Sequence, residues 1–165
     1  MFMLAFWACS PTAEDTAADT ESEAITEEET QESNDDFVPD EVDTSFCEED
    51  YALCGTIEIP SDFTGSSRNL AIVLYESIPP AGPPAYIIEE IENPNVAAGQ
   101  PFQVASTPVL ASGEYYLWFN LYMEGGGEWV PVNDVDYTGS TADPIVFDGS
   151  AVSFEGVTLE LASGW

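Results

Sequence analysis

The feature that most constrains the fold of this chain is a series of short segments in which apolar and polar side chains alternate. Gly, Pro, Asn and Asp separate these segments between residues 45 and 165, and no stretch repeats its apolar residues at the period of about 3.6 that marks a helix. Regularly spaced short strands without helices predict an all-β sandwich or barrel. We predict seven strands, at residues 53–59, 70–78, 86–91, 102–109, 115–123, 129–132, and a C-terminal pair merged from 145–147 and 152–161.

Two of these segments carry enough pattern to assign their faces. Residues 70–75, LAIVLY, are apolar at both parities, which predicts a central strand covered on both faces. Residues 115–123 alternate instead, so one parity faces the core. That parity comprises Tyr115, Leu117, Phe119, Leu121 and Met123. The three glycines at 125–127 are expected to turn the chain into the next strand, 129–132.

The N-terminal part of the chain has a different composition. Residues 10–44 hold 14 Asp and Glu, many Ser and Thr, no basic residue and almost no large apolar side chain. A segment with low hydropathy and high net charge cannot offset the entropy lost on ordering. We therefore predict a disordered acidic tether at 9–44, which follows a short apolar segment at 1–8 and precedes a single folded domain at 45–165.

The charge of the chain excludes whole classes of partner. There are 32 acidic residues against one basic residue, Arg68, for a net charge of −31. Nucleic acid is excluded because no cluster of cations could neutralise its phosphates, and direct adhesion to anionic lipid head groups is excluded for the same reason. Two interpretations of the acidity stay open: adaptation to salt or plain solubility, and a charged segment that itself acts.

The missing residue types also limit the chemistry. The chain has no His and no Lys, which removes the usual general base near neutral pH, His-bearing zinc sites and lysine Schiff bases. Paired carboxylates can hydrolyse glycosides, but no motif here places such a pair. The sequence therefore predicts a protein that is not an enzyme.

The three cysteines separate into a pair and a remainder. Cys47 and Cys54 enclose six residues, and the acidic stretch between them could turn the chain back, so we predict a disulfide. The alternative is two small buried residues that stay reduced. Cys9 is left over, and an exported protein usually avoids a free thiol, so this residue needs its own explanation.

Residues 4–9, LAFWAC, resemble a bacterial lipobox, in which the cysteine becomes the lipidated first residue of the mature protein. Ala8 fits the small residue before the cysteine, whereas Phe6 and Trp7 are bulkier than the pattern. No basic residue precedes the apolar run, so we expect the true start to lie upstream. The resemblance implies lipid attachment at Cys9, which would anchor an exported protein to the bacterial cell envelope, at the outer membrane or the cell surface.

The folded part resembles carboxypeptidase-regulatory-like, transthyretin-like domains. The segments that carry the resemblance, in order, are CGTIEI, LAIVLYESIP, SGEYYLWFNLY with its Gly-x-Tyr at Gly113 and Tyr115, and GVTLEL. It implies a seven-stranded antiparallel Greek-key β-sandwich, transthyretin- or immunoglobulin-like, that stabilises or binds rather than catalyses.

One acidic loop is a candidate calcium site. In residues 133–144, Asp134, Asp136 and Thr138 fall at the first, third and fifth positions of a calcium loop, and Asp143 lies two residues before the usual bidentate position. The same residue types also form ordinary turns, so a solvated loop is the alternative. No other cofactor is predicted.

The second candidate site is an aromatic strip. Tyr116, Trp118 and Tyr122 share the face of strand 115–123 that points away from the core. If that face is open, it offers a platform for a glycan or a protein partner. The alternative is that a neighbouring loop covers it, and the proline-rich segment 78–86 is the candidate cover. Taken together, the sequence predicts a lipid-anchored structural or interaction module of the envelope, or alternatively a calcium-dependent or glycan-binding surface module.

Overall fold

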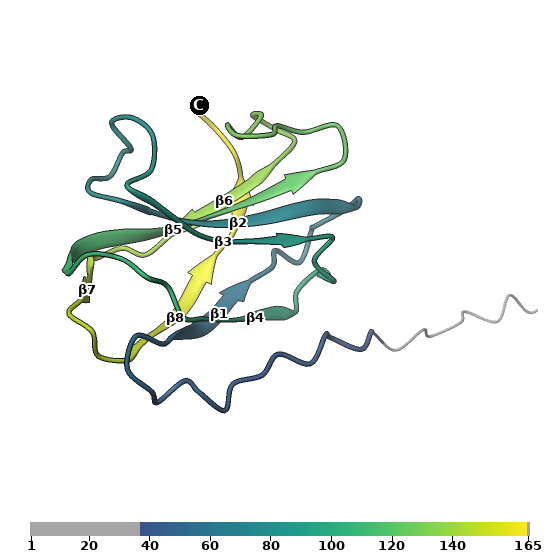
Figure 1. Ribbon diagram of the computed structural model, residues 1–165. Helices are drawn as coiled ribbons and strands as arrows, with labels where there is room; N and C mark the ends of the chain where they lie inside the picture. The colour runs from purple at the N-terminus through teal and green to yellow at the C-terminus, as the bar shows by residue number, and fades with distance from the viewer. Residues whose placement is uncertain (1–36, 165) are drawn as a thin grey trace, which may run out of the picture. The chain divides into compact units, whose positions relative to one another are not determined.

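Nine β-strands form the regular structure of residues 37–164, the part of the chain that the computed structural model describes, and no helix occurs among them. The strands form two layers that face each other (Figure 1). The all-β, sandwich-like class predicted from the alternating segments is therefore confirmed. The compact unit that holds these strands spans Asp36–Trp165, so it begins before residue 45.

The smaller sheet has the order β4-β1-β8. Its strands are β1 (Leu53–Glu58), β4 (Pro101–Ser106) and β8 (Val152–Thr158). β1 pairs with β4 antiparallel but with β8 parallel. This parallel pair departs from the wholly antiparallel arrangement expected, because β8 reaches β1 through a long crossover rather than through a hairpin.

The larger sheet has the order β3-β2-β5-β6-β9, with β7 pairing the start of β5. Its strands are β2 (Ser67–Tyr75), β3 (Tyr86–Glu92), β5 (Gly113–Met123), β6 (Tyr137–Ser140), β7 (Ile145–Phe147) and β9 (Glu160–Leu161). The C-terminal segment thus serves both sheets, since β8 pairs in the smaller one and β9 in the larger. Nine strands are formed where seven were expected.

The core lies between the two inner faces. The predicted core parity of β5 is confirmed, because Tyr115, Leu117, Phe119, Leu121 and Met123 are all buried in one cluster. Phe119 of the larger sheet packs on Phe154 of the smaller one, with ring centroids 5.3 Å apart. β2 is central, as predicted, and its last six residues are buried at both parities.

The predicted strand at 129–132 is wrong. Residues 124–136 form a loop between β5 and β6, and the partner of β5 is Tyr137–Ser140, which the sequence had placed in the candidate calcium loop. The amide N–H groups of Gly127 and Val132 donate to the carboxylate of Asp136 instead of to a neighbouring strand. Val132, the last residue of the predicted strand, therefore gives its N–H to a side chain, and Gly127, just before that strand, does the same.

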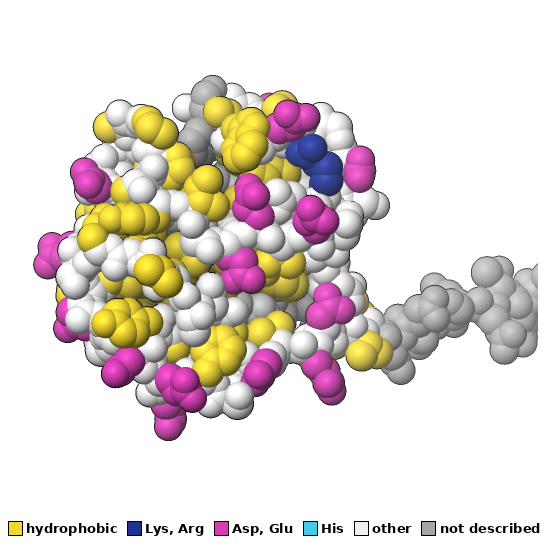
Figure 2. Space-filling view, viewed as in Figure 1, with side chains coloured by type: hydrophobic (Ala, Val, Ile, Leu, Met, Phe, Trp, Pro, Cys, Tyr) yellow, Lys and Arg dark blue, Asp and Glu magenta, His cyan; other side chains and the backbone are white. Residues whose placement is uncertain are grey.

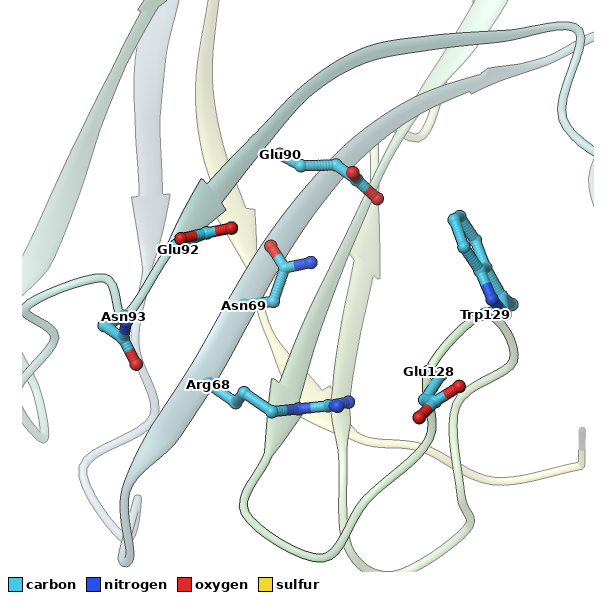
Figure 3. A pocket seen from close by; sticks show the side chains of 7 residues that line it. All are labelled: Arg68, Asn69, Glu90, Glu92, Asn93, Glu128 and Trp129. Carbon is cyan, nitrogen blue, oxygen red and sulfur yellow. The ribbon is translucent and has the colours of Figure 1, made fainter.

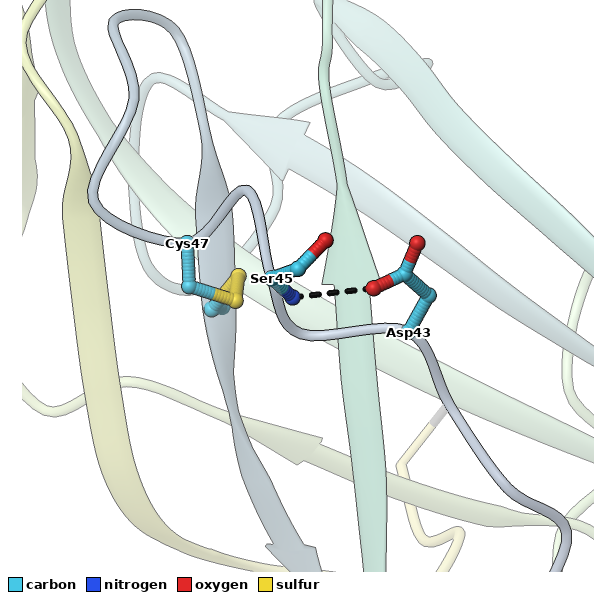
Figure 4. Close-up of a disulfide and its surroundings, with 4 residues drawn as sticks. Asp43, Ser45 and Cys47 are labelled. Atoms are coloured by element: carbon cyan, nitrogen blue, oxygen red, sulfur yellow. Dashed lines mark hydrogen bonds between the residues drawn. A yellow bond between two sulfur atoms is a disulfide. The ribbon is translucent and has the colours of Figure 1, made fainter.

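A disulfide joins Cys47 to Cys54, as predicted, with a Cα–Cα distance of 5.7 Å (Figure 4). The chain turns back between them through hydrogen bonds that include Glu49 N–H to Phe46 O at 2.8 Å. Just before the bridge, the amide of Ser45 donates to the Asp43 carboxylate at 2.9 Å, and this bond lowers the pKa of Asp43. The bridge ties the segment before β1 to the strand itself.

Residues 1–36 lie outside the described part of the chain, so the predicted lipidation residue Cys9 and most of the acidic tether lie outside it as well. Within residues 37–164, no helix is long and apolar enough to cross a membrane.

Candidate functional site

The main candidate site is a cavity of about 910 Å³ on the outer face of the larger sheet, which we call the outer groove. Apolar and aromatic side chains provide most of its lining, and few polar groups interrupt them. Its lining residues are Ala71, Val73, Tyr75, Pro80, Gly82, Pro83, Pro84, Ala85, Tyr86, Ile87, Glu90, Asn120, Tyr122, Glu128, Trp129 and Val130. Apolar patches with scattered acidic side chains are visible on the face shown in Figure 2.

The floor of the groove comes from the outward parity of β2 and β5. Ala71, Val73, Tyr75 and Tyr122 form a second hydrophobic cluster, separate from the core, with Trp118 packed against it. Successive side chains of a strand point to opposite faces, so the strand pattern that fills the core with one parity builds this floor with the other. This is why residues 70–75 of β2 are apolar at both parities.

One polar floor residue is already engaged. The side chain of Asn120 is buried, and its Oδ1 accepts a hydrogen bond from Trp118 Nε1 at 3.0 Å. The ring of Trp118 also meets Tyr75 edge-on, with centroids 5.9 Å apart. These contacts hold the floor in place and leave it largely apolar.

Two loops and β3 raise the walls. The proline-rich loop between β2 and β3 forms one wall, anchored where the amide of Ala85 donates to Leu74 O at 2.8 Å. The loop 124–136 forms another, and it carries Trp129 and Val130, whose side chains are 71% and 60% exposed. Ile87 of β3 is also half-exposed, at 53%. Exposed apolar groups gathered around one cavity are typical of a binding site.

A buried carboxylate positions the second loop. Asp136 has no exposed surface, and it accepts three backbone N–H bonds, from Met123 at 2.8 Å, Gly127 at 2.8 Å and Val132 at 2.7 Å. The carboxylate approaches the backbone so closely that a Cβ at Gly126 would lie 1.9 Å from its Oδ1. The glycines before Trp129 are therefore required for the carboxylate to enter, as well as for the turn.

A smaller cavity of about 420 Å³ adjoins the groove and shares Glu90, Glu128 and Trp129 with it (Figure 3). Arg68, the only basic residue of the chain, lies here, and its Nη2 donates to the backbone oxygen of Gly127. Asn69, Glu92 and Asn93 complete the lining. The space-filling view shows acidic side chains around the single basic one (Figure 2).

The environment of the groove is apolar and negative. Burial, the largest cause, and the nearby Tyr75, Asp136 and Glu90 together raise the pKa of Tyr122 to about 12, against the opposing effect of Arg68. Burial also raises the pKa of Tyr75. Both phenols therefore keep their protons at neutral pH and can donate hydrogen bonds.

The three residues of the predicted aromatic platform do not line one cavity. Tyr122 is buried in the groove floor, at 3% exposure. Trp118 lines a different cavity of about 460 Å³ with residues of β6 and the C-terminal segment, and Tyr116 is half-buried and lines neither cavity. The proline-rich segment, which was the candidate cover of this face, forms a wall of the groove and leaves it open.

The predicted calcium residues do not form one loop. Asp134 and Asp143 are exposed, Thr138 lies in β6, and the oxygens of Asp136 are occupied by backbone N–H groups. Within residues 37–164 there is no group of three or more His, Cys, Asp or Glu side chains that could hold a metal ion. A calcium site at these residues stays a prediction.

The sequence did not indicate that one site contains Trp129, Val130, Glu90 and Asn120. They come from a loop and two strands far apart in the sequence, and Trp129 and Val130 had been read as a strand. The sequence feature that could have indicated this loop is a run of three glycines followed by an acidic residue. Such a pattern is compatible with a loop built around a carboxylate.

Comparison with known protein families, with curated proteins and with solved structures finds no match to this chain.

Proposed function

We propose that this chain is a non-catalytic binding module, exported and anchored to the bacterial cell envelope by a lipid on Cys9. The observation that carries the proposal is the outer groove. Its volume of about 910 Å³ lies within the range of about 300–1,000 Å³ usual for small-molecule sites, and its apolar lining with few polar groups is typical of them.

The disulfide supports export. Bonds of this kind form and persist in oxidising compartments and are rare in the cytosol. Cys47 and Cys54 are joined by a disulfide. Of the three cysteines in the sequence, Cys9 is therefore the one left over. Lipid attachment at Cys9 gives that residue a role, and the acidic segment after it would hold the domain away from the membrane.

The composition of the groove supports binding over catalysis. Its ionisable side chains are tyrosines, Glu90 and Glu128, and the chain offers no His or Lys to act as a base. The raised pKa values of Tyr75 and Tyr122 keep those phenols protonated, so they are poor nucleophiles at neutral pH.

We further propose that the sandwich is of the transthyretin-like, Greek-key kind. The segments that resemble that family form β1, β2, β5 and the β8–β9 region. In that family such a domain acts as an accessory or binding module, which agrees with the groove.

Glycan binding is the second candidate, and the exposure of Trp129 favours it. Its ring is 71% exposed at the rim, where it could stack on a sugar. Calcium dependence has less support, because Asp136 already accepts three hydrogen bonds.

Lipid labelling tests the anchoring part of the proposal. Cells that express the chain with an N-terminal export signal added are fed a labelled fatty acid, and we expect the parent protein to incorporate it and Cys9→Ser to lose it. The matched control is the double variant Cys47→Ser/Cys54→Ser, which keeps Cys9 and should stay labelled. Label that persists in Cys9→Ser would contradict the anchor.

A ligand screen tests the binding part. The full chain carrying Cys9→Ser is screened against small molecules and glycans by thermal shift, and each hit is repeated with Trp129→Ala. We expect hits to weaken in this variant but not in Val109→Ala, whose side chain is 99% exposed outside the groove. Hits whose thermal shift is the same in Trp129→Ala would indicate that these ligands bind outside the groove.

A further inference from the structure

We infer that the outer groove binds a small organic cation, an ammonium group carried on an apolar body. This inference rests on the proposed function, because it presupposes that the groove receives a ligand. It goes further by naming the charge and the chemical class of that ligand.

The lining of the groove is rich in aromatic side chains. Tyr75, Tyr86, Tyr122 and Trp129 all line the groove, and they come from β2, β3, β5 and the loop 124–136. The faces of aromatic rings are electronegative, so several of them around one cavity attract a cation, and alkylated ammonium groups are recognised in this way. Ala71 and Val73 in the floor offer contact to the apolar body of such a ligand.

The charge around the groove complements a cation. Glu90 and Glu128 line the groove from two different walls, and Glu92 lies in the adjoining cavity. Figure 3 shows Glu90 and Glu128 on either side of the space in front of Trp129. On a chain with a net charge of −31, an anionic ligand would be repelled and a cationic one drawn in.

The one nearby positive charge, that of Arg68, does not make the groove repel cations. Arg68 lines the smaller cavity but not the outer groove, and its Nη2 donates to the backbone of Gly127. This bond holds the guanidinium beside the loop 124–136, and its Nε is buried there.

The lining of the groove is less suited to a neutral sugar. A sugar ring needs several hydrogen-bonding partners, because polar groups that lose water without replacing it cost free energy. Asn120, the amide side chain in the groove lining, already accepts a bond from Trp118, and the rest of the floor is Ala, Val and Tyr. The remaining polar side chains of the lining are three phenols and the carboxylates of Glu90 and Glu128. Most of the lining would therefore meet a sugar ring without a hydrogen-bond partner, whereas the aromatic and acidic groups favour an alkylated ammonium.

The test uses matched probes on the full chain carrying Cys9→Ser. Isothermal titration compares choline with its neutral carbon isostere 3,3-dimethylbutan-1-ol, and adds benzyltrimethylammonium as a cation with a larger apolar body. Maltohexaose serves as the glycan probe. We expect both cations to bind, benzyltrimethylammonium more tightly, while the neutral isostere binds at least about fivefold more weakly than choline.

Two variants locate the site. Trp129→Ala should weaken cation binding by about fivefold and Glu128→Gln by about threefold, since exposed cation–π and charge pairs are each worth about 0.5–1 kcal/mol. Glu114→Gln is the matched charge control, because Glu114 is exposed on β5 and does not line the groove. It should leave cation binding within about 1.5-fold, a change that salt screening of a distant charge allows.

The outcomes separate this inference from the proposed function. If maltohexaose binds in a manner that depends on Trp129 and the cations do not bind, the cation inference is overturned and the binding module stands. Equal binding of choline and its neutral isostere also overturns the inference, as does equal weakening by Glu128→Gln and Glu114→Gln. Failure of lipid labelling at Cys9 counts against the proposed anchor alone.

Discussion

Replacement of Asp136 should destabilise the protein far more than replacement of any other acidic residue between positions 124 and 143. The carboxylate is fully buried and accepts N–H bonds from Met123, Gly127 and Val132 at 2.7–2.8 Å. Asp136→Ala removes the acceptor and leaves those three donors behind. The main chain of Asp136 also bonds to Val132 and Ala162, and these bonds remain in the variant.

The magnitude follows from the burial of each donor. The Met123 N–H is buried, so losing its partner costs about 2–3 kcal/mol, the upper part of the usual range for an unsatisfied buried group. The bonds from Gly127 and Val132 are partly exposed, and water can replace the carboxylate there, so each costs about 1 kcal/mol. Relief of the desolvated charge offsets part of this sum. We expect a net loss of about 3–4 kcal/mol, a large share of the 5–15 kcal/mol typical of a domain.

Asp136→Asn separates charge from geometry. Its one carboxamide oxygen can take the place of Oδ2 and accept from Gly127 and Val132, but its NH₂ then faces the N–H of Met123. We expect a loss of about 2 kcal/mol, smaller than that of Asp136→Ala. Asp134→Ala is the control, because Asp134 is exposed two residues away and should change stability by less than about 0.5 kcal/mol.

Urea denaturation of the full chain carrying Cys9→Ser, followed by tryptophan fluorescence and far-UV circular dichroism, measures these differences. Hydrogen exchange of the Met123 amide gives a local readout, since that N–H should exchange slowly in the parent and faster in Asp136→Ala. A loss below about 1 kcal/mol in Asp136→Ala, or one equal to that of Asp134→Ala, would refute the assignment of Asp136 as the residue that organises this loop.

Three further predictions concern pH, the disulfide and metal ions. The pKa of Tyr122 is raised from 10.0 to about 12, so its contribution to stability is complete below pH 10 and is lost as pH rises toward 12; Tyr122→Phe should flatten the fall in unfolding free energy measured by denaturation across that window. Reduction of the Cys47–Cys54 bridge, which closes a loop with a sequence separation of 7, should lower the free energy of unfolding by about 2 kcal/mol on the chain-entropy scale, and Cys47→Ser/Cys54→Ser should be insensitive to reductant. CaCl₂ and MgCl₂ at equal concentration should raise the thermal midpoint equally by screening the charge of −31, whereas a gain confined to Ca²⁺ and lost in Asp134→Ala would support the calcium site.

Local sequence pattern was sufficient for the features that depend on neighbouring residues. The alternation in β5 predicted its core face residue by residue, because the pleat of a strand allows only two directions for side chains. The continuous apolar run in β2 predicted a strand covered on both faces. The spacing of Cys47 and Cys54 predicted their bridge, because a close pair needs only a turn between them.

Only the tertiary structure decided the features that depend on distant partners. Residues 129–132 have the composition of a strand, yet they belong to a loop. The Asp136 carboxylate accepts the N–H of Val132 in this segment and that of Gly127 just before it. The strand then forms at Tyr137–Ser140, beside β5. The sequence determined which residues are able to pair. The hydrogen bonds to the Asp136 carboxylate and the pairing of β6 with β5 decided which of them do, and they placed Trp129 and Glu128 at the groove.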